Sequence, residues 1–131
     1  MGCTEKVEFV AAPRDNLMKP NLLRVDDVAW EPHPRFKALQ VKVLESKATH
    51  PHASVMMVKV EPGGVIPEHS HSIEIETAYV MEGTGVLTVD GQDYPFEAGI
   101  NASIPVGAVH SVRNVGAGSM LIYAVHTPPI R

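Results

Sequence analysis

Residues 63–83 read GGVIPEHSHSIEIETAYVMEG and contain two histidines one residue apart, His69 and His71, followed by the carboxylate of Glu76. In an extended strand, residues i and i+2 point to the same face, so both imidazoles face one point. Imidazole and carboxylate ligands together suit first-row transition metals. A further histidine, His110, lies in a second compact stretch, GINASIPVGAVHSVRN. We interpret these three histidines and the glutamate as one metal site inside a β-barrel.

Short segments with glycine and proline punctuation lie on both sides of this stretch. Residues 36–46 alternate apolar and polar side chains, residues 54–64 end in a Pro-Gly-Gly turn, and residues 120–129 begin with an apolar run. Residues 82–85, Glu-Gly-Thr-Gly, are one turn signal. Asp90 and Gly91 separate two further short segments and predict a tight hairpin. Short strands spaced about 8–12 residues apart favour a sandwich or barrel. No stretch shows the hydrophobic periodicity of a helix. The sequence therefore predicts an all-β fold.

The length of 131 residues fits one domain with one hydrophobic core. We place the barrel domain at residues 36–131. Residues 1–35 are irregular and carry several prolines, so we expect an extended N-terminal arm that lies over the barrel or on a neighbouring subunit. Trp30, the only tryptophan, is expected to anchor this arm by packing.

Charge and composition exclude several function classes. Lys and Arg number 11 against 15 Asp and Glu, which gives a formal net charge of −4 without basic runs, so nucleic acid is not an expected partner. No apolar run approaches the roughly 20 residues of a membrane helix, and the first residues lack the apolar core of a secretory signal. The single cysteine, Cys3, cannot form an intrachain disulfide. We expect a cytoplasmic protein.

Two motifs with fixed spacing carry a resemblance to a known family. The first requires Gly, five residues, His-x-His, three or four residues, Glu, six residues and Gly. It is met by Gly63, His69, His71, Glu76 and Gly83. The second requires Gly, five residues, Pro-x-Gly, two residues, His, three residues and Asn. It is met by Gly99, Pro105, Gly107, His110 and Asn114. With both motifs complete, the chain resembles the cupin superfamily, in particular its small single-domain members.

The resemblance implies a double-stranded β-helix, or jelly-roll, barrel. It also implies a divalent transition metal held by His69, His71, Glu76 and His110, and the donor set does not choose among iron, manganese, nickel, zinc, cobalt and copper. Homodimers are common in such proteins. The apolar segment MLIYAVH, residues 120–126, and the N-terminal arm are the candidates for a dimer interface.

Other polar residues compete for roles at the site. Glu74 is an alternative carboxylate, but only Glu76 fits the spacing of the motif. His50 and His52 form a second His-x-His pair, yet the intervening proline favours a solvated turn. His126 has two interpretations: we expect it to pack in the last strand, and the alternative is that it points into the cavity as a group supporting the ligands or as a general base.

Two function classes follow from these residues. The first is a metalloenzyme acting on a small organic molecule, and the resemblance allows dioxygenase, decarboxylase, isomerase or lyase chemistry. We lean towards oxygen-dependent chemistry because no second inward acid or base is identifiable, and an inward His126 or Tyr123 would weaken that argument. The second is a non-enzymatic, metal-dependent binding protein. Neither Arg nor Lys clusters near the motifs, and Arg113 is expected on the opposite face to His110, so a phosphate or polyanionic substrate is not favoured.

Overall fold

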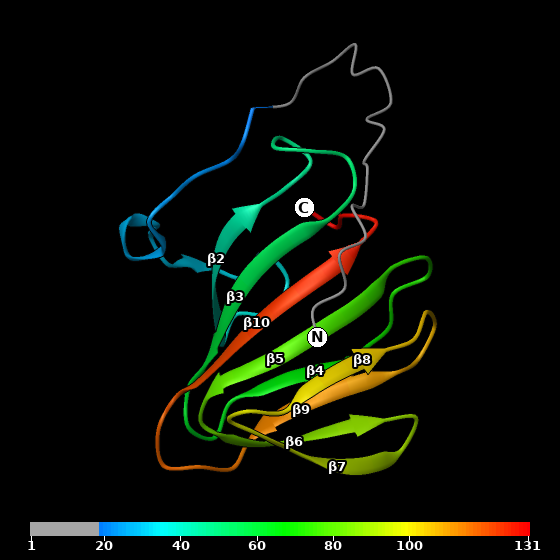
Figure 1. The fold of residues 1–131 in the computed structure, drawn as a ribbon. Coiled ribbons are helices and arrows are strands. Elements are labelled where there is room, and N and C mark those ends of the chain that lie inside the picture. The colour runs from blue at the N-terminus through cyan, green and yellow to red at the C-terminus, as the bar shows by residue number, and fades with distance from the viewer. Residues whose placement is uncertain (1–18) are drawn as a thin grey trace, which may run out of the picture.

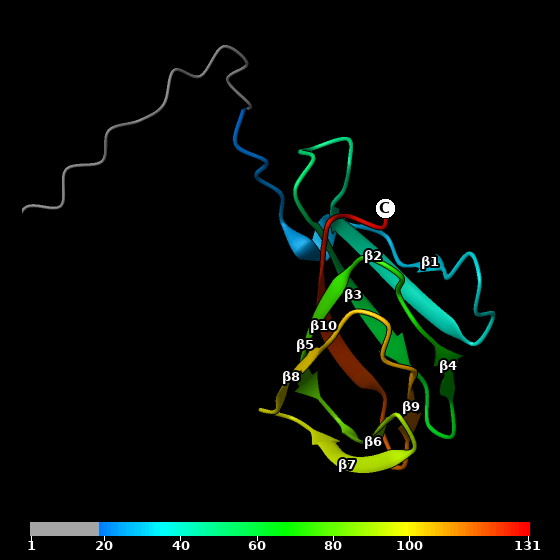
Figure 2. The ribbon, with the colours of Figure 1, turned by 90° about the vertical axis from the view of Figure 1, so that its right-hand side faces the viewer.

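The computed structural model describes residues 19–131, so the predictions for Cys3 and for the start of the arm lie outside the described residues. Two antiparallel sheets face each other and confirm the predicted all-β jelly-roll barrel (Figure 1 and Figure 2). The six-stranded sheet has the order β1-β2-β3-β10-β5-β8, and the four-stranded sheet the order β4-β9-β6-β7. The strands are β1 (Glu31–Pro32), β2 (Leu39–Glu45), β3 (Ser54–Val60), β4 (Val65–His69), β5 (Ile75–Glu82), β6 (Thr84–Val89), β7 (Gln92–Glu97), β8 (Asn101–Ile104), β9 (His110–Asn114) and β10 (Met120–Thr127).

Alternation along the strands builds the core between the two sheets. In β10, Met120, Ile122 and Ala124 are at most 4% exposed, whereas Tyr123 between them is 38% exposed. The four-stranded sheet contributes Leu87 and Phe96 from the opposite side of the same core. Burial of each such side chain contributes about 1.5–3 kcal/mol, and the shared parity fixes which residues of a strand can reach the interior.

Turn residues set the connections as the sequence predicts, with one difference. The β6–β7 hairpin turns at Asp90 and Gly91, whose φ angles of 47° and 81° suit a two-residue turn with left-handed residues. The expected turn at residues 82–85 is tighter than predicted, because Gly83 alone joins β5 to β6 and Gly85 already pairs within β6. A β-carbon on Gly85 would lie 2.6 Å from the Met120 side chain, so the residue is small because the core packs directly against it.

The described part of the N-terminal segment lies across the outer face of β2 and β3. The indole of Trp30 has the ammonium groups of Lys42 and Lys59 at 4.9 and 4.7 Å from its ring, a geometry favourable for cation–π attraction. Lys42 Nζ also donates a hydrogen bond to the Val25 carbonyl at 3.0 Å. Trp30 and Val25 pack on a second apolar cluster that includes Met57, so Trp30 is a packing anchor as predicted.

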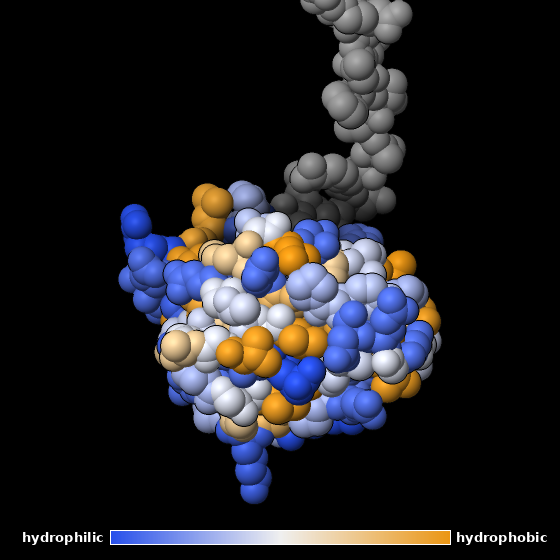
Figure 3. Space-filling view, turned by 90° about the horizontal axis from the view of Figure 1, so that it is seen from below, coloured by the Kyte–Doolittle hydropathy of each residue, from blue (hydrophilic) through white to orange (hydrophobic). Residues whose placement is uncertain are grey.

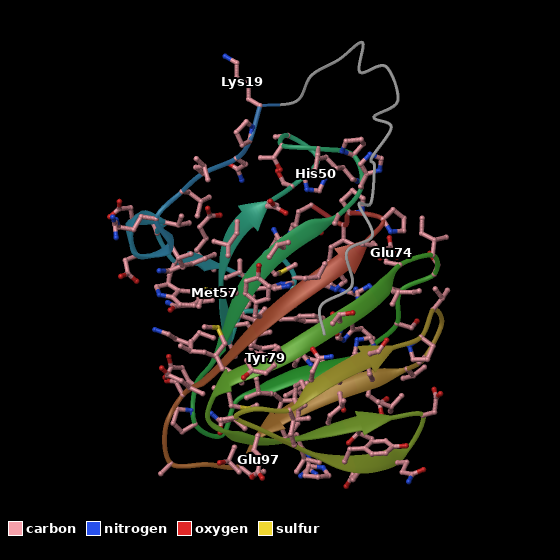
Figure 4. The ribbon with its side chains drawn as sticks, viewed as in Figure 1. Lys19, His50, Met57, Glu74, Tyr79 and Glu97 are labelled. Carbon is pink, nitrogen blue, oxygen red and sulfur yellow. The ribbon has the colours of Figure 1, made fainter. Side chains whose placement is uncertain are left out.

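The rest of this outer face is open to solvent. Tyr79 and Tyr123 are register partners on β5 and β10 and are 43% and 38% exposed. Tyr79 projects from the sheet on the same side as Met57, as Figure 4 shows, so it does not pack between the sheets. Seen from below, apolar side chains are interspersed with polar ones (Figure 3). The structure contains one chain, and the expected homodimer stays a prediction.

Within the described part of the chain, no helix is long and apolar enough to cross a membrane. The helical segment there is a single 3-10 turn, Val25–Asp27, which begins the stretch that leads to Trp30.

Asn114, the last residue of the second motif, joins three backbone segments. Its side-chain amide donates hydrogen bonds to the carbonyls of Val60 and Gly118 at 2.9 and 2.8 Å, and its oxygen accepts one from the Gly116 N–H. The side chain is 4% exposed. The Asn114 side chain therefore supplies hydrogen bonds to backbone groups at the end of β3 and in the loop after β9.

We predict that Asn114→Ala lowers the free energy of unfolding by about 1–3 kcal/mol, because it leaves the buried Val60 carbonyl without a donor. Chemical denaturation followed by circular dichroism measures the change. Asn101→Ala, on the exposed side of β8, is the matched control and should change stability little. Equal unfolding free energies for both variants would show that Asn114 has no structural role.

Candidate metal centre

Four predicted ligands converge between the two sheets. His69 ends β4 and is the register partner of His110 on β9, while Glu76 faces them from β5 on the other sheet. His71 lies just beyond β4, where its carbonyl accepts a hydrogen bond from the Gly107 N–H at 2.9 Å. One ligand atom from each of the four side chains lies within 4.8 Å of all the others. Both sheets therefore contribute to one candidate metal centre.

The orientation of the imidazoles suits metal coordination. Nδ1 of His69 donates to the Pro67 carbonyl at 2.8 Å, and Nδ1 of His110 donates to the Ala108 carbonyl at 2.9 Å. These bonds place the ring proton on Nδ1 and leave the Nε2 lone pair free. Nε2 of His71 and Nε2 of His110 are buried and have no hydrogen-bond partner among residues 19–131. A divalent cation would satisfy these buried nitrogens, so the residues fit such an ion.

Glu76 provides the negative charge of the cluster. Its oxygens lie 3.6 Å from His71 Nε2 and 3.5 Å from His110 Nε2. Burial alone would raise the pKa of Glu76, but the surrounding contacts with His110, His126 and His71 hold that pKa well below its usual range. The carboxylate is therefore ionised and available as a ligand.

The histidines respond differently to the same surroundings. Burial lowers the pKa of His69, which favours the neutral, coordinating imidazole. For His110, burial would also lower the pKa, but the Glu76 carboxylate and the hydrogen bond to the Ala108 carbonyl raise it overall. In this cluster a proton on His110 occupies the place that a metal cation would take beside the carboxylate.

His126 points into the cavity. The expectation that it packs in the last strand is therefore wrong, and the alternative position is the one observed. It is the register partner of Glu76 across β10 and β5 and is 3% exposed. Its Nε2 donates a hydrogen bond to Glu76 Oε1 at 2.5 Å, and its Nδ1 is buried without a partner among the described residues. His126 therefore fixes the orientation of the carboxylate. A signal for this was present, because His126 continues the parity of the buried residues of β10.

The competing polar residues lie away from the centre. Glu74 is not part of the cluster, and its carboxylate accepts a hydrogen bond from the neighbouring Ile73 N–H; Figure 4 shows it at the start of β5. His50 pairs with Glu45 at 3.2 Å in the loop between β2 and β3, and His52 is exposed beside it. The preference for Glu76 over these groups agrees with the geometry.

The centre lines a cavity of about 430 Å³. Its walls are mostly apolar and are formed by Leu39, Met56, Val58, Ile66, Val112 and Ala124. Two arginines, Arg35 and Arg131, also line it. No cluster of Arg or Lys near the motifs indicated these two residues, and the fold brings both to the cavity from outside the two motifs. Arg113 does point away from the cavity, as predicted, and pairs with Asp93 at 3.6 Å.

Comparison with known proteins gives a family match and several relatives. A family profile described as "Cupin domain" matches residues 56–126. The HTH-type transcriptional regulator PuuR of Escherichia coli is 36% identical over 81 residues, which are 60% of this chain and 44% of the regulator. The polyketide synthase CurC of Streptomyces cyaneus is 32% identical over 101 residues, 76% of this chain and 64% of CurC. The chain thus spans less than half the length of the regulator.

A solved structure of similar fold covers most of the chain. The crystal structure of a Thermotoga maritima protein described as a predicted oxalate decarboxylase matches with a TM-score of 0.75 and 26% identity. The match covers 82% of this chain and 98% of that one. The names of these similar proteins thus refer to transcriptional regulation, polyketide synthesis and oxalate decarboxylation.

Proposed function

The chain belongs to the cupin domain family, and from this premise we propose that the protein is a metal-dependent enzyme acting on a small organic molecule. One observation carries the proposal: the two histidines His71 and His110 present buried, unpartnered Nε2 atoms among the described residues, towards the Glu76 carboxylate. The cavity above them admits a small molecule and offers apolar walls to it.

We propose His69, His71, Glu76 and His110 as the ligands of a divalent transition metal. No thiolate takes part, so a closed structural zinc site is not indicated. A bound ion with four protein ligands would keep open positions and supply Lewis-acid or oxygen-activating chemistry there. The protein itself orients the ligands, through the carbonyls behind the histidines and through His126 behind Glu76.

The inward position of His126 changes the argument about reaction class. The preference for dioxygenase-type chemistry rested on the absence of a second inward acid or base, and His126 is such a group. Its Nε2–H donates to Glu76, while its buried Nδ1 has no hydrogen-bond partner among the described residues. The proposal therefore covers oxygen-dependent chemistry together with decarboxylase, isomerase and lyase chemistry. Oxygen uptake with iron-loaded protein separates the first from the others.

A second candidate function is non-enzymatic binding of a small ligand that depends on the metal. The observation in its favour is the 36% identity to a transcriptional regulator over 81 residues of this chain. A ligand of such a protein would raise the unfolding temperature without being consumed. If chromatography over several hours shows that a stabilising ligand is consumed, the protein is an enzyme and not a binding protein.

We predict that His69→Ala and His110→Ala each abolish stoichiometric metal binding and leave the barrel folded, because each removes one of four ligands. Metal analysis per chain and circular dichroism on the same samples test this. His52→Ala, in the exposed loop before β3, is the matched histidine control and should retain the metal. Unfolding of the two ligand variants would indicate a structural ion, and full metal content in them would refute the assigned ligands.

A separate prediction concerns the residue behind the carboxylate. We expect His126→Ala to weaken metal affinity about 10–100-fold, which is typical for loss of a group that orients a ligand. His126→Gln retains an N–H donor and should recover most of the affinity. Competition with a chromophoric chelator measures both, and unfolding of the metal-free variants controls for damage to the core. Unchanged affinity in His126→Ala would mean that Glu76 needs no support from β10.

A further inference from the structure

The mouth of the cavity carries positive charge that the candidate metal centre does not use. Arg35 and Arg131 both line it, and neither forms an ion pair within residues 19–131. The one carboxylate in the cavity lining is Glu76, which is already engaged by histidines. Among the described residues, no carboxylate of the cavity lining is thus free to pair with either guanidinium group, and Arg35, which is exposed, lies over the Phe36 ring instead.

Arg131 is held in place by its backbone. Its carbonyl accepts a hydrogen bond from the Lys47 N–H at 2.8 Å. The preceding Ile130 N–H donates to Ser54 Oγ at 3.1 Å, and Ser54 is fully buried. Nη2 of Arg131 is itself buried and has no hydrogen-bond partner among the described residues. A buried, unpaired guanidinium nitrogen is costly, so its position is a sign of an absent partner.

His33, Arg35 and Phe36 form another part of the cavity lining. Nδ1 of His33 accepts hydrogen bonds from the backbone N–H groups of Arg35 and Phe36 at 3.0 and 3.1 Å, which places the proton of the neutral ring on Nε2. The His33 ring stacks on the Phe36 ring with 4.9 Å between the ring centroids. The centroid of the Phe36 ring in turn lies 5.5 Å from that of the His69 ring. This part of the lining therefore connects directly to the candidate metal centre.

His33 adds a donor without adding charge. Burial lowers its pKa to about 4, with further lowering by Arg131, His69 and Arg35. The imidazole is thus neutral near pH 7, and the positive charge of the mouth belongs to the two arginines. His33, Arg35 and Arg131 line the same cavity.

We propose that the mouth binds the carboxylate of a small organic acid, with Arg131 as its main partner and Arg35 on the rim, while the apolar body of the acid fills the cavity towards the candidate metal centre. This inference rests on the proposed function and names its substrate class. The planar guanidinium fork matches a carboxylate in a two-bond arrangement. A single negative charge balances the guanidinium of Arg131, of which Nη2 is buried, whereas a doubly charged phosphate would carry more charge into apolar walls.

The test compares acids with their uncharged amides. Zinc-loaded protein is titrated by calorimetry with benzoate, phenylacetate and 3-phenylpropionate, and with the primary amide of each. At least one acid should bind about tenfold to a hundredfold tighter than its amide, as expected for hydrogen bonds to a charged group. Arg131→Gln should remove this preference, because it weakens the binding of the acids more than that of the amides. Arg35→Gln should weaken the preference to a smaller extent.

Arg113→Gln is the matched control, because it makes the same change of charge on the outer face of β9, and it should keep the full preference. Equal affinities for acids and amides, no binding of any acid, or an unchanged preference in Arg131→Gln would each overturn the inference. Tighter binding of phenyl phosphate than of every carboxylate would also overturn it in favour of phosphate.

The failure of this inference is distinguishable from the failure of the proposed function. Zinc content per chain is measured on the same samples, and the titrations are repeated with metal-free protein. A chain that takes up neither zinc nor iron, manganese, nickel, cobalt or copper refutes the metal centre, while the comparison of acid and amide with metal-free protein still decides on the mouth. A zinc-loaded chain without any preference for acids keeps the metal centre and loses the carboxylate site.

Discussion

A buried carboxylate surrounded by imidazoles is the constraint on which the rest of this structure depends. Moving an ionised group out of water costs several kcal/mol unless other groups compensate for it. Glu76 finds this compensation in His126 on its own sheet and in His71 and His110 across the barrel. Within each sheet, strand pairing fixes the positions of these groups: β4 with β9 aligns His69 with His110, and β5 with β10 aligns Glu76 with His126.

Much of this arrangement was predictable because two local rules decide it. The parity of an extended chain places His69 and His71 together, and the motif spacing relates them to Glu76 and His110. The strands predicted at residues 54–64 and 120–129 are observed as β3 (Ser54–Val60) and β10 (Met120–Thr127). These features involve short distances along the chain, where sequence patterns are informative.

The features that the sequence did not reveal depend on long-range topology. β10 lies between β3 and β5, and only this placement brings His126 opposite Glu76. Arg131 enters the cavity because the chain after β10 returns over Ser54. Arg35 reaches it through the turn that stacks His33 on Phe36. None of these residues lies near the motifs in sequence, so a search for charge around the motifs missed them.

The candidate metal ligands and the arginines of the mouth lie in different parts of the chain. The region that matches the family, residues 56–126, contains the four candidate ligands and His126. The arginines of the mouth, Arg35 and Arg131, lie on either side of that region. Mutations in the flanks can alter what enters the barrel without disturbing the geometry at its centre. Divergence among relatives would then proceed by exchange of the flanks around a constant interior, which is one route by which a single fold acquires many specificities.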